Sequence, residues 1–519
     1  MKMIDRRTLL GAGAVLGAAT ALPTALGAAP RAPIVTTTLG RVRGRTEAGL
    51  SVFRGVRYGT AERFRAPTAP ARSREIVDAA AFGPSAPQRG DRYQPASEDC
   101  LFLNVWTPEA KAGGRRPVLV YFHGGAYSGG SVADPLNDGR HLAARGDAVV
   151  VTVNHRLNAL GYLYLARLDP RFPDSGNLGQ LDLILALQWI RDNIAAFGGD
   201  PSRVLVFGQS GGGAKIATLM GMPAAEGLFH RAITMSGQQV TASGPLNATA
   251  RARAYLDGLK ATPGDLLDMS VERLVEGLSA TDPILGGGVY FGPVLDMKWL
   301  TRHPFWPDAN PQSNRIPMIL GNTRDETRAF IDPRGPKLAG LDWSNLAERI
   351  APELKMDIHP EWVVGQYRQH YPSWSAERIF YAATTAGRSW PGQVLEADAR
   401  AAAETPTWVY QVDFQSPVEP WRGAPHTIDI PLSFGTLDAQ GSITGTGVAA
   451  RTLSGQVMDA FLAFARSGDP SHAGLPSWPR YRLPDRATMV FDVESRAIDD
   501  PRRWERALFA RVPYIQPGT

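Results

Sequence analysis

Val204-Leu-Val-Phe-Gly-Gln-Ser-Gly-Gly-Gly213, followed by the apolar stretch AKIATLM, is the part of the sequence that decides the fold. Its apolar start predicts a buried strand, and the residues after Gly213 predict a helix. Ser210 stands at the turn between them, with Gly208 and Gly212 two positions before and after it. Because so tight a turn admits only very small residues there, we interpret it as a nucleophile elbow, which lifts a serine hydroxyl above a sheet. The alternative is a glycine-rich turn with an incidental serine.

Strands and helices alternate on both sides of this turn. Continuous apolar runs such as AVVVTVN at 148–154 are typical of strands covered on both faces. The pattern predicts an α/β fold with a mostly parallel sheet flanked by helices. Segments 240–300 and 335–400 are more polar and helical, and we expect them to be insertions over the active site. Further strands are predicted at 116–122, 232–235, 317–320 and 407–414, and helices at 181–197, 214–220 and 456–466.

Composition excludes several classes of protein. With 44% hydrophobic and 20% charged residues, the chain of 519 residues is not of the disordered class. Its single cysteine, Cys100, excludes an internal disulfide framework and any cysteine-rich metal site. The net charge of +5 comes without a run of basic residues, so we expect no nucleic-acid partner.

Residues 1–29 read as an export signal. The pair Arg6-Arg7 precedes a stretch rich in Leu, Ala and Gly, with plausible cleavage sites after Gly27 and Ala29. The pattern looks like a twin-arginine signal, which predicts a periplasmic or secreted protein. An uncleaved membrane anchor is the alternative, although no later segment is apolar enough to span a membrane, so no stable insertion of the mature chain is expected. Residues 32–515 are predicted to form one catalytic domain.

A second glycine-rich segment, His123-Gly124-Gly125-Ala126, directly follows the strand at 116–122. Two consecutive glycines allow backbone N–H groups to approach a ligand oxygen, as an oxyanion hole requires. His123 itself is interpreted as structural.

The remaining catalytic groups should follow the serine in the order acid, then histidine. His426 lies on a loop at the end of the strand at 407–414, where catalytic groups of open α/β sheets gather. His359 and His370 lie in a polar helical stretch and His472 in a loop, so all three are interpreted as surface residues. For the acid, chain order leaves three candidates open: Asp296, Asp325 and Glu326.

Taken together, these motifs resemble the type-B carboxylesterase family, which includes bacterial para-nitrobenzyl esterases and the cholinesterases. The resemblance runs from about Thr37 to Arg511, nearly the whole mature chain. The segments that carry it are SEDCLFLNVW at 97–106, HGGAYSG at 123–129, GNLG at 176–179, FGGDP at 197–201, the serine elbow and GNTRDE at 321–326.

The resemblance implies an α/β-hydrolase fold and assigns roles to particular residues. Ser210 would be the nucleophile, Glu326 the acid and His426 the base. Backbone N–H groups of Gly124, Gly125 and Gly211 would form the oxyanion hole, and Ser236 would support the acid. No cofactor or metal is implied.

The chain also departs from the family pattern. Its elbow reads Gly-Gln-Ser-Gly-Gly, so Gln209 replaces a carboxylate that usually stands beside the serine. This removes an attraction for cationic substrates. Segment 85–98 holds no tryptophan, so the choline-binding platform of the cholinesterases is not expected.

The predicted function is therefore a serine carboxylesterase that acts on small-molecule esters through an acyl-enzyme. One alternative is an acyl hydrolase of the same fold with another bond or bulky substrate: a lipase, an amidase, or a hydrolase of carbamates or toxin esters. The other is a cholinesterase-like binding protein without activity. The sequence leaves the substrate and the oligomeric state open.

Overall fold

The computed structural model describes residues 32–519, whose main feature is an 11-stranded mixed sheet. Six adjacent pairs, from β8 through β7, β9, β10, β11 and β12 to β13, are parallel, and the strands at both edges are antiparallel. In spatial order the strands are β14 (Arg496–Asp499), β13 (Ala487–Phe491), β12 (Thr407–Val412), β11 (Met318–Thr323), β10 (Arg231–Met235), β9 (Gly199–Gln209), β7 (Arg116–Phe122), β8 (Val149–Val153), β6 (Phe102–Thr107), β4 (Leu50–Arg57) and β3 (Arg45–Glu47). The predicted α/β class is confirmed.

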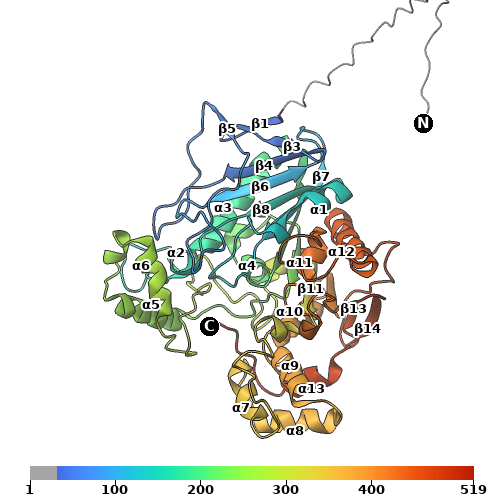
Figure 1. Cartoon of the computed structure of the whole chain (residues 1–519). Helices are drawn as coiled ribbons and strands as arrows, with labels where there is room; N and C mark the ends of the chain where they lie inside the picture. Colours follow the sequence, from blue (N-terminus) through green and yellow to red (C-terminus); the bar gives the residue numbers. More distant parts are fainter. Residues whose placement is uncertain (1–31) are drawn as a thin grey trace, which may run out of the picture. The chain divides into compact units, whose positions relative to one another are not determined.

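Helices cover both faces of this sheet (Figure 1). One face packs against α3 (Leu178–Asn193) and α4 (Gly211–Leu219). The other packs against α1 (Arg140–Gly146), α11 (Asp429–Phe434) and α12 (Val448–Ser467). Each face therefore has its own apolar core, as expected for a sheet whose central strands are apolar on both sides.

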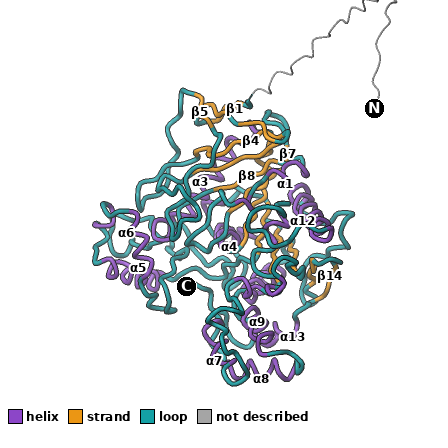
Figure 2. The backbone as a smooth tube through the Cα atoms, viewed as in Figure 1, coloured by secondary structure: helices purple, strands orange, loops and turns teal. Residues whose placement is uncertain are grey.

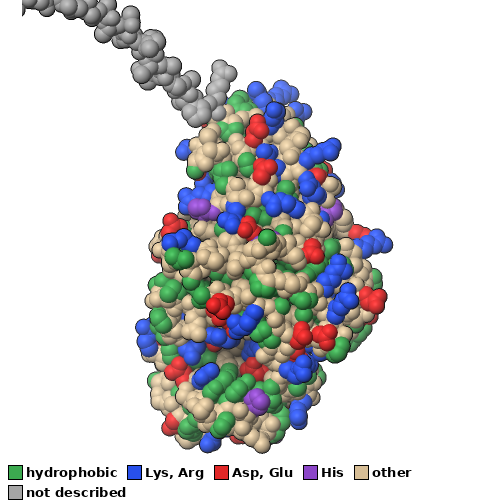
Figure 3. Space-filling view, turned by 90° about the vertical axis from the view of Figure 1, so that its right-hand side faces the viewer, with side chains coloured by type: hydrophobic (Ala, Val, Ile, Leu, Met, Phe, Trp, Pro, Cys, Tyr) green, Lys and Arg blue, Asp and Glu red, His purple; other side chains and the backbone are tan. Residues whose placement is uncertain are grey.

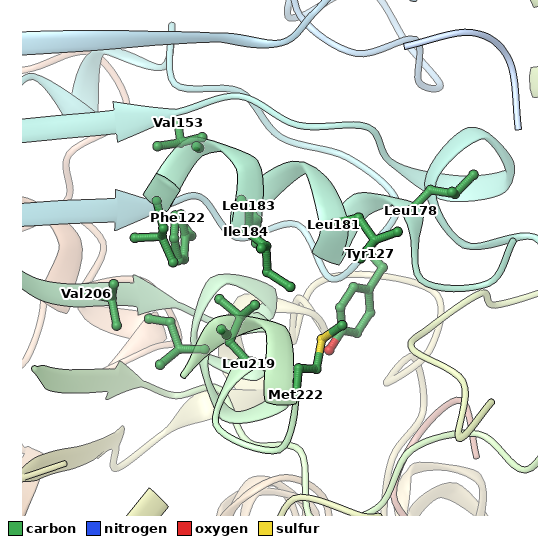
Figure 4. Packing of buried hydrophobic residues seen from close by; sticks show 14 of the residues in the cluster. Phe122, Tyr127, Val153, Leu178, Leu181, Leu183, Ile184, Val206, Leu219 and Met222 are labelled. Atoms are coloured by element: carbon green, nitrogen blue, oxygen red, sulfur yellow. The ribbon is translucent and has the colours of Figure 1, made fainter. Parts of the chain in front are cut away.

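The core on the α3 side joins distant parts of the chain. Figure 4 shows Phe122 and Val206 from the sheet near Ile184 of α3 and Leu219 of α4. All four side chains are at least 96% buried. Burying one such side chain typically contributes about 1.5–3 kcal/mol, so this layer fixes the position of the β9–α4 turn.

Two predicted helices are longer than the sequence pattern indicated. The helix expected at 181–197 begins at Leu178 and ends in a 3-10 turn, and the one expected at 456–466 runs from Val448 to Ser467. After one apolar residue each, Leu178 and Val448, their first turns continue with small or polar residues, so apolar periodicity alone did not reveal them. The sequence analysis also left the edge strands unassigned, including the separate sheet of β1 (Ile34–Thr37), β2 (Gly40–Arg43) and β5 (Ile76–Asp78).

The two predicted insertions are helical. The first contains α5 (Pro245–Leu259) and α6 (Val271–Glu276). The second contains α7 (Leu346–Ile350), α8 (Pro360–His370), α9 (Ala376–Ala386) and α10 (Trp390–Ala402). Helices α7 to α9 share an apolar cluster with α13 (Arg503–Phe509), and Figure 2 shows them grouped apart from the sheet. The short helix α2 (Asn158–Tyr162) follows β8.

Three further observations concern the described chain as a whole. Cys100 is fully buried, two residues before β6, in the core on the α3 side. None of the helices within residues 32–519 is long and apolar enough to cross a membrane. Basic and acidic side chains are interspersed on the face in Figure 3. The predicted export signal, residues 1–29, lies outside the described residues.

Candidate active site

Ser210 occupies the sharp turn between β9 and α4. Its backbone has φ 56° and ψ −125°, a conformation that non-glycine residues rarely adopt. The Ser210 N–H donates to the carbonyl of Met235 at 2.7 Å, and Ala214 N–H donates to the Ser210 carbonyl at 3.1 Å, so both sides of the turn are tied down. Strain held in this way is typical of functional positions.

The predicted oxyanion segment lies against this turn. A Cβ atom on Gly124 would lie 3.3 Å from Ser210 Cβ, so the two backbones are in close contact. Gly125 has φ 86°, which favours glycine. Gly211 touches the same segment, because a Cβ added there would collide with the carbonyl oxygen of Ala126. The three predicted oxyanion glycines are therefore brought together around the serine.

Lys215 is a component that the sequence analysis missed. This lysine of α4 is completely buried, and its ammonium donates to the carbonyls of His123 at 3.1 Å and Ala126 at 3.0 Å. It thereby fastens the oxyanion segment to the helix behind the serine. Burial lowers the pKa of Lys215 to about 7. Burial and the Lys215 charge also lower the pKa of His123 to about 3, which fits a structural role.

Glu326 and His426 meet beside the serine. Glu326 begins the 3-10 turn after β11, and its Oε2 contacts His426 Nδ1. Its Oε1 accepts hydrogen bonds from Ser236 Oγ at 2.5 Å, Thr323 N–H at 2.7 Å and the Asn322 amide at 3.2 Å. Burial alone would raise the pKa of Glu326, but His426 and these donors outweigh it and hold the pKa below 4.5. The carboxylate is thus kept charged where it can orient an imidazole.

Gln209 takes an unexpected position. Its amide nitrogen lies 3.1 Å from His426 Nε2, and the Gln209 side chain is 1% exposed. With Nδ1 facing Glu326, Nε2 is the acceptor in this contact. In the described part of the chain, the acceptor nitrogen of His426 is therefore paired with Gln209 and not with Ser210 Oγ. A neutral amide can donate to Nε2, whereas the carboxylate usual at this position could not.

The other candidates are placed elsewhere. Asp325, next to the acid, turns away and exchanges two hydrogen bonds with Ala424, each 2.9 Å long, which fixes the loop before His426. Asp296 accepts the Asn177 amide and caps the turn that follows it. His359 is 91% exposed and His370 is also exposed, while His472 is partly buried in its loop, bonded to Gln456.

A cavity of about 420 Å³ opens above Ser210 and His426. Its inner wall includes Gly125, Gln209, Ser210, Gly211, Ser236 and His426. Its outer wall comes from three separate segments and holds Gln238, Arg388 and Gln516. Sequence reasoning missed all three, because no motif links positions so far apart.

Comparisons with known proteins agree with this architecture. Residues 31–506 match the carboxylesterase family. The chain is 34% identical to the para-nitrobenzyl esterase of Bacillus subtilis (strain 168), over 91% of this chain and 97% of that protein. It is 33% identical to the phenmedipham hydrolase of Pseudarthrobacter oxydans, over 90% and 96%.

Solved structures give the same result. The crystal structure of the carboxylesterase EST55 of Geobacillus stearothermophilus at pH 6.2 superimposes with a TM-score of 0.82 and 35% identity, covering 92% of this chain and 99% of that one. These carboxylesterases confirm the predicted α/β-hydrolase fold. By sequence and by structure the chain belongs to the carboxylesterase family and is a carboxylic ester hydrolase.

Proposed function

We propose that this hydrolase cleaves small-molecule esters with Ser210 as nucleophile, His426 as base and Glu326 as the acid that orients the base. The observation that carries the proposal is the contact of Glu326 with His426 Nδ1, together with the place of His426 and the strained Ser210 in the lining of one cavity. Residues at least 100 positions apart in the sequence are brought together there.

The mechanism follows from these positions. Substrate entry lets Ser210 Oγ replace the Gln209 amide at His426 Nε2. Ser210 attacks the ester carbonyl while His426 takes its proton, and the N–H groups of Gly124, Gly125 and Gly211 receive the negative oxygen. His426 then protonates the leaving alcohol. Water, activated by the same imidazole, releases the acid from Ser210.

The pKa of the acid supports this assignment. Because the pKa of Glu326 lies below 4.5, the carboxylate is charged at neutral pH and stabilises the imidazolium that forms in each step. The close backbone approaches at Gly124 and Gly211 exclude side chains there, as an oxyanion hole built from backbone N–H groups requires.

The direct test uses p-nitrophenyl butyrate with the mature chain and the Ser210→Ala variant. We expect turnover by the native enzyme and a loss of at least about 10⁴-fold in the variant. A fluorophosphonate probe should add one covalent label to the native chain, mapped to Ser210 by mass spectrometry, and none to the variant. Full turnover by Ser210→Ala would refute the proposed nucleophile.

A different scissile bond is the second candidate for the natural reaction. The relative from Pseudarthrobacter oxydans is called a phenmedipham hydrolase, and the same serine chemistry could act on carbamates or amides. A p-nitroanilide matched to the butyrate ester separates these cases. A kcat/KM for the anilide equal to that for the ester would favour an amidase, and a much smaller one the esterase proposed here.

We also propose that residues 1–29 direct export through a twin-arginine pathway, to the periplasm or the medium. The support is the Arg6-Arg7 pair before an apolar stretch. Replacing both arginines by lysine should retain the protein in the cytoplasm of a host with that pathway, as judged by cell fractionation. Unchanged export would contradict the proposal.

A further inference from the structure

The catalytic cavity has an uneven distribution of charge. Of the described residues that line it, Arg388 carries the one permanent charge, and none is Asp or Glu. Gln209 contributes to this, since it is neutral where the family pattern has a carboxylate. The lining of the cavity thus carries a positive charge at Arg388, which favours anionic groups beside it.

Arg388 is held close to the predicted base. It follows α9, where Lys355 N–H donates to the carbonyl of the preceding Gly387 at 2.8 Å. Its guanidinium carbon lies 4.7 Å from the centre of the Phe330 ring, which lies 5.0 Å from the centre of the His426 ring. These spacings put the charge within about 10 Å of the imidazole, a distance comparable to the Debye length at 0.1 M salt.

The charge of Arg388 is poorly neutralised by its surroundings. Within residues 32–519 its ion-pair partner is Glu353, at 3.5 Å, which is longer than the roughly 3.2 Å limit of a good hydrogen bond. Glu353 is closer to Lys337, at 2.8 Å. Lys355 adds another cation nearby, and its pKa is lowered by burial and by Arg388. Cations therefore outnumber carboxylates around this part of the cavity.

The wall beside Arg388 is polar. Gln238 and Gln516 are more than 90% buried and line the same cavity. Gln516 accepts from Val240 N–H at 3.1 Å, which holds its segment in the wall. A polar wall next to an under-neutralised guanidinium accommodates a charged group at lower cost than an apolar one.

We propose that the preferred substrates are esters that carry a free carboxylate, with Arg388 binding that carboxylate while Ser210 attacks the ester. Monoesters of short dicarboxylic acids are the simplest members of this class. Water is added across the acyl–oxygen bond, so a monomethyl ester gives the dicarboxylate, methanol and one proton. The inference rests on the proposed esterase function and specifies its substrate.

The test compares monomethyl adipate with methyl hexanoate, which have acyl chains of equal length and differ in the terminal carboxylate. Acid release is followed by pH-stat, and p-nitrophenyl butyrate serves as a separate measure of the serine chemistry. We expect the native enzyme to favour monomethyl adipate in kcat/KM by about 10-fold, as a charge-assisted hydrogen bond allows. The preference should shrink with added salt.

Three variants sharpen the comparison. Arg388→Gln should lower the adipate-to-hexanoate ratio about 10-fold, mainly through KM, and Arg388→Lys should restore much of it. Arg378→Gln is the matched control, because Arg378 lies on α9, the helix just before Arg388, but lines a separate cavity. It should leave the ratio unchanged.

The outcomes separate the two proposals. Failure to hydrolyse p-nitrophenyl butyrate would contradict the proposed function itself. Hydrolysis of the butyrate with no preference for the carboxylate, or with a preference that Arg388→Gln leaves intact, would overturn this inference alone.

Discussion

The inner and outer walls of the catalytic cavity are built differently. The inner wall is shaped mainly by backbone: at Gly124 and Gly211 the chain approaches the serine turn so closely that side chains are excluded at these two positions, and Gln209 adds its side chain beside them. The outer wall consists of side chains, among them Arg388 and Gln516, from segments distant in the sequence. Backbone geometry restricts which residues are possible, whereas a side-chain wall can change without disturbing the fold. In the function proposed above, the inner wall carries the reaction and the outer wall selects the substrate.

Among changes that keep the three proposed catalytic residues, the largest effect is expected from a small change in the inner wall. Gly211→Ala adds a Cβ that would collide with the carbonyl of Ala126. Displacing the oxyanion segment should lower kcat for p-nitrophenyl butyrate by about 10²-fold. Gly365→Ala in α8, where a Cβ would meet open space, is the control. Equal activity of the two variants would show that the oxyanion segment accommodates the added Cβ, and would contradict this prediction.

Ser236→Ala should have a smaller effect, through the acid. Its hydroxyl donates to Glu326 Oε1 at 2.5 Å, and its loss should lower kcat about 10-fold. Because the pKa of Glu326 is lowered, its charge stabilises the fold above pH 4.5, and this contribution is lost as pH falls through the lowered pKa. With one donor fewer, acid unfolding should begin at higher pH. Circular dichroism during acid titration measures this, and an unchanged midpoint would contradict it.

Gln209→Glu alters the charge of the inner wall with little change of shape. A carboxylate about 3 Å from the imidazole favours its charged form, so the acidic limb of the kcat/KM profile should move up by about 1 pH unit. Profiles for a neutral ester measure the limb. Gln209→Ala adds no charge and should show no such upward shift. A limb that stays in place in Gln209→Glu would mean that residue 209 faces away from the base during turnover.

The smallest effect is expected in the outer wall away from Arg388. Gln516→Ala removes the acceptor for Val240 N–H and widens the cavity. KM for esters of different acyl length should change about threefold, with kcat nearly constant, because the group binds substrate and transition state alike. A fall in kcat as large as that expected for Gly211→Ala would contradict the assignment of the reaction to the inner wall and of substrate choice to the outer wall.

The same division explains what the sequence could predict. The elbow and His123–Ala126 were recognisable because tight turns and close backbone approaches demand glycine at fixed spacings. The choice between Asp325 and Glu326 was open to chain order, since the two are adjacent and only the turn after β11 sends one to Ala424 and the other to His426. It depended on the family resemblance.

Other parts left no local signal. Nothing in the sequence around Lys215 distinguishes it from other lysines of helices. Its two carbonyl partners come from a segment about 90 residues away. The edge strands β13 and β14 are short and form by pairing with each other and with β12, which periodicity does not reveal.

Cys100 allows local opening of the core to be measured. Its thiol is the only one in the chain, is fully buried, and has a pKa raised well above its usual value by burial. A thiol reagent can therefore react with it only when the segment just before β6 opens to solvent. The rate of modification relative to that of a free thiol gives the free energy of this local opening. Rates measured with and without substrate then show whether substrate binding changes the opening, with no second labelling site introduced.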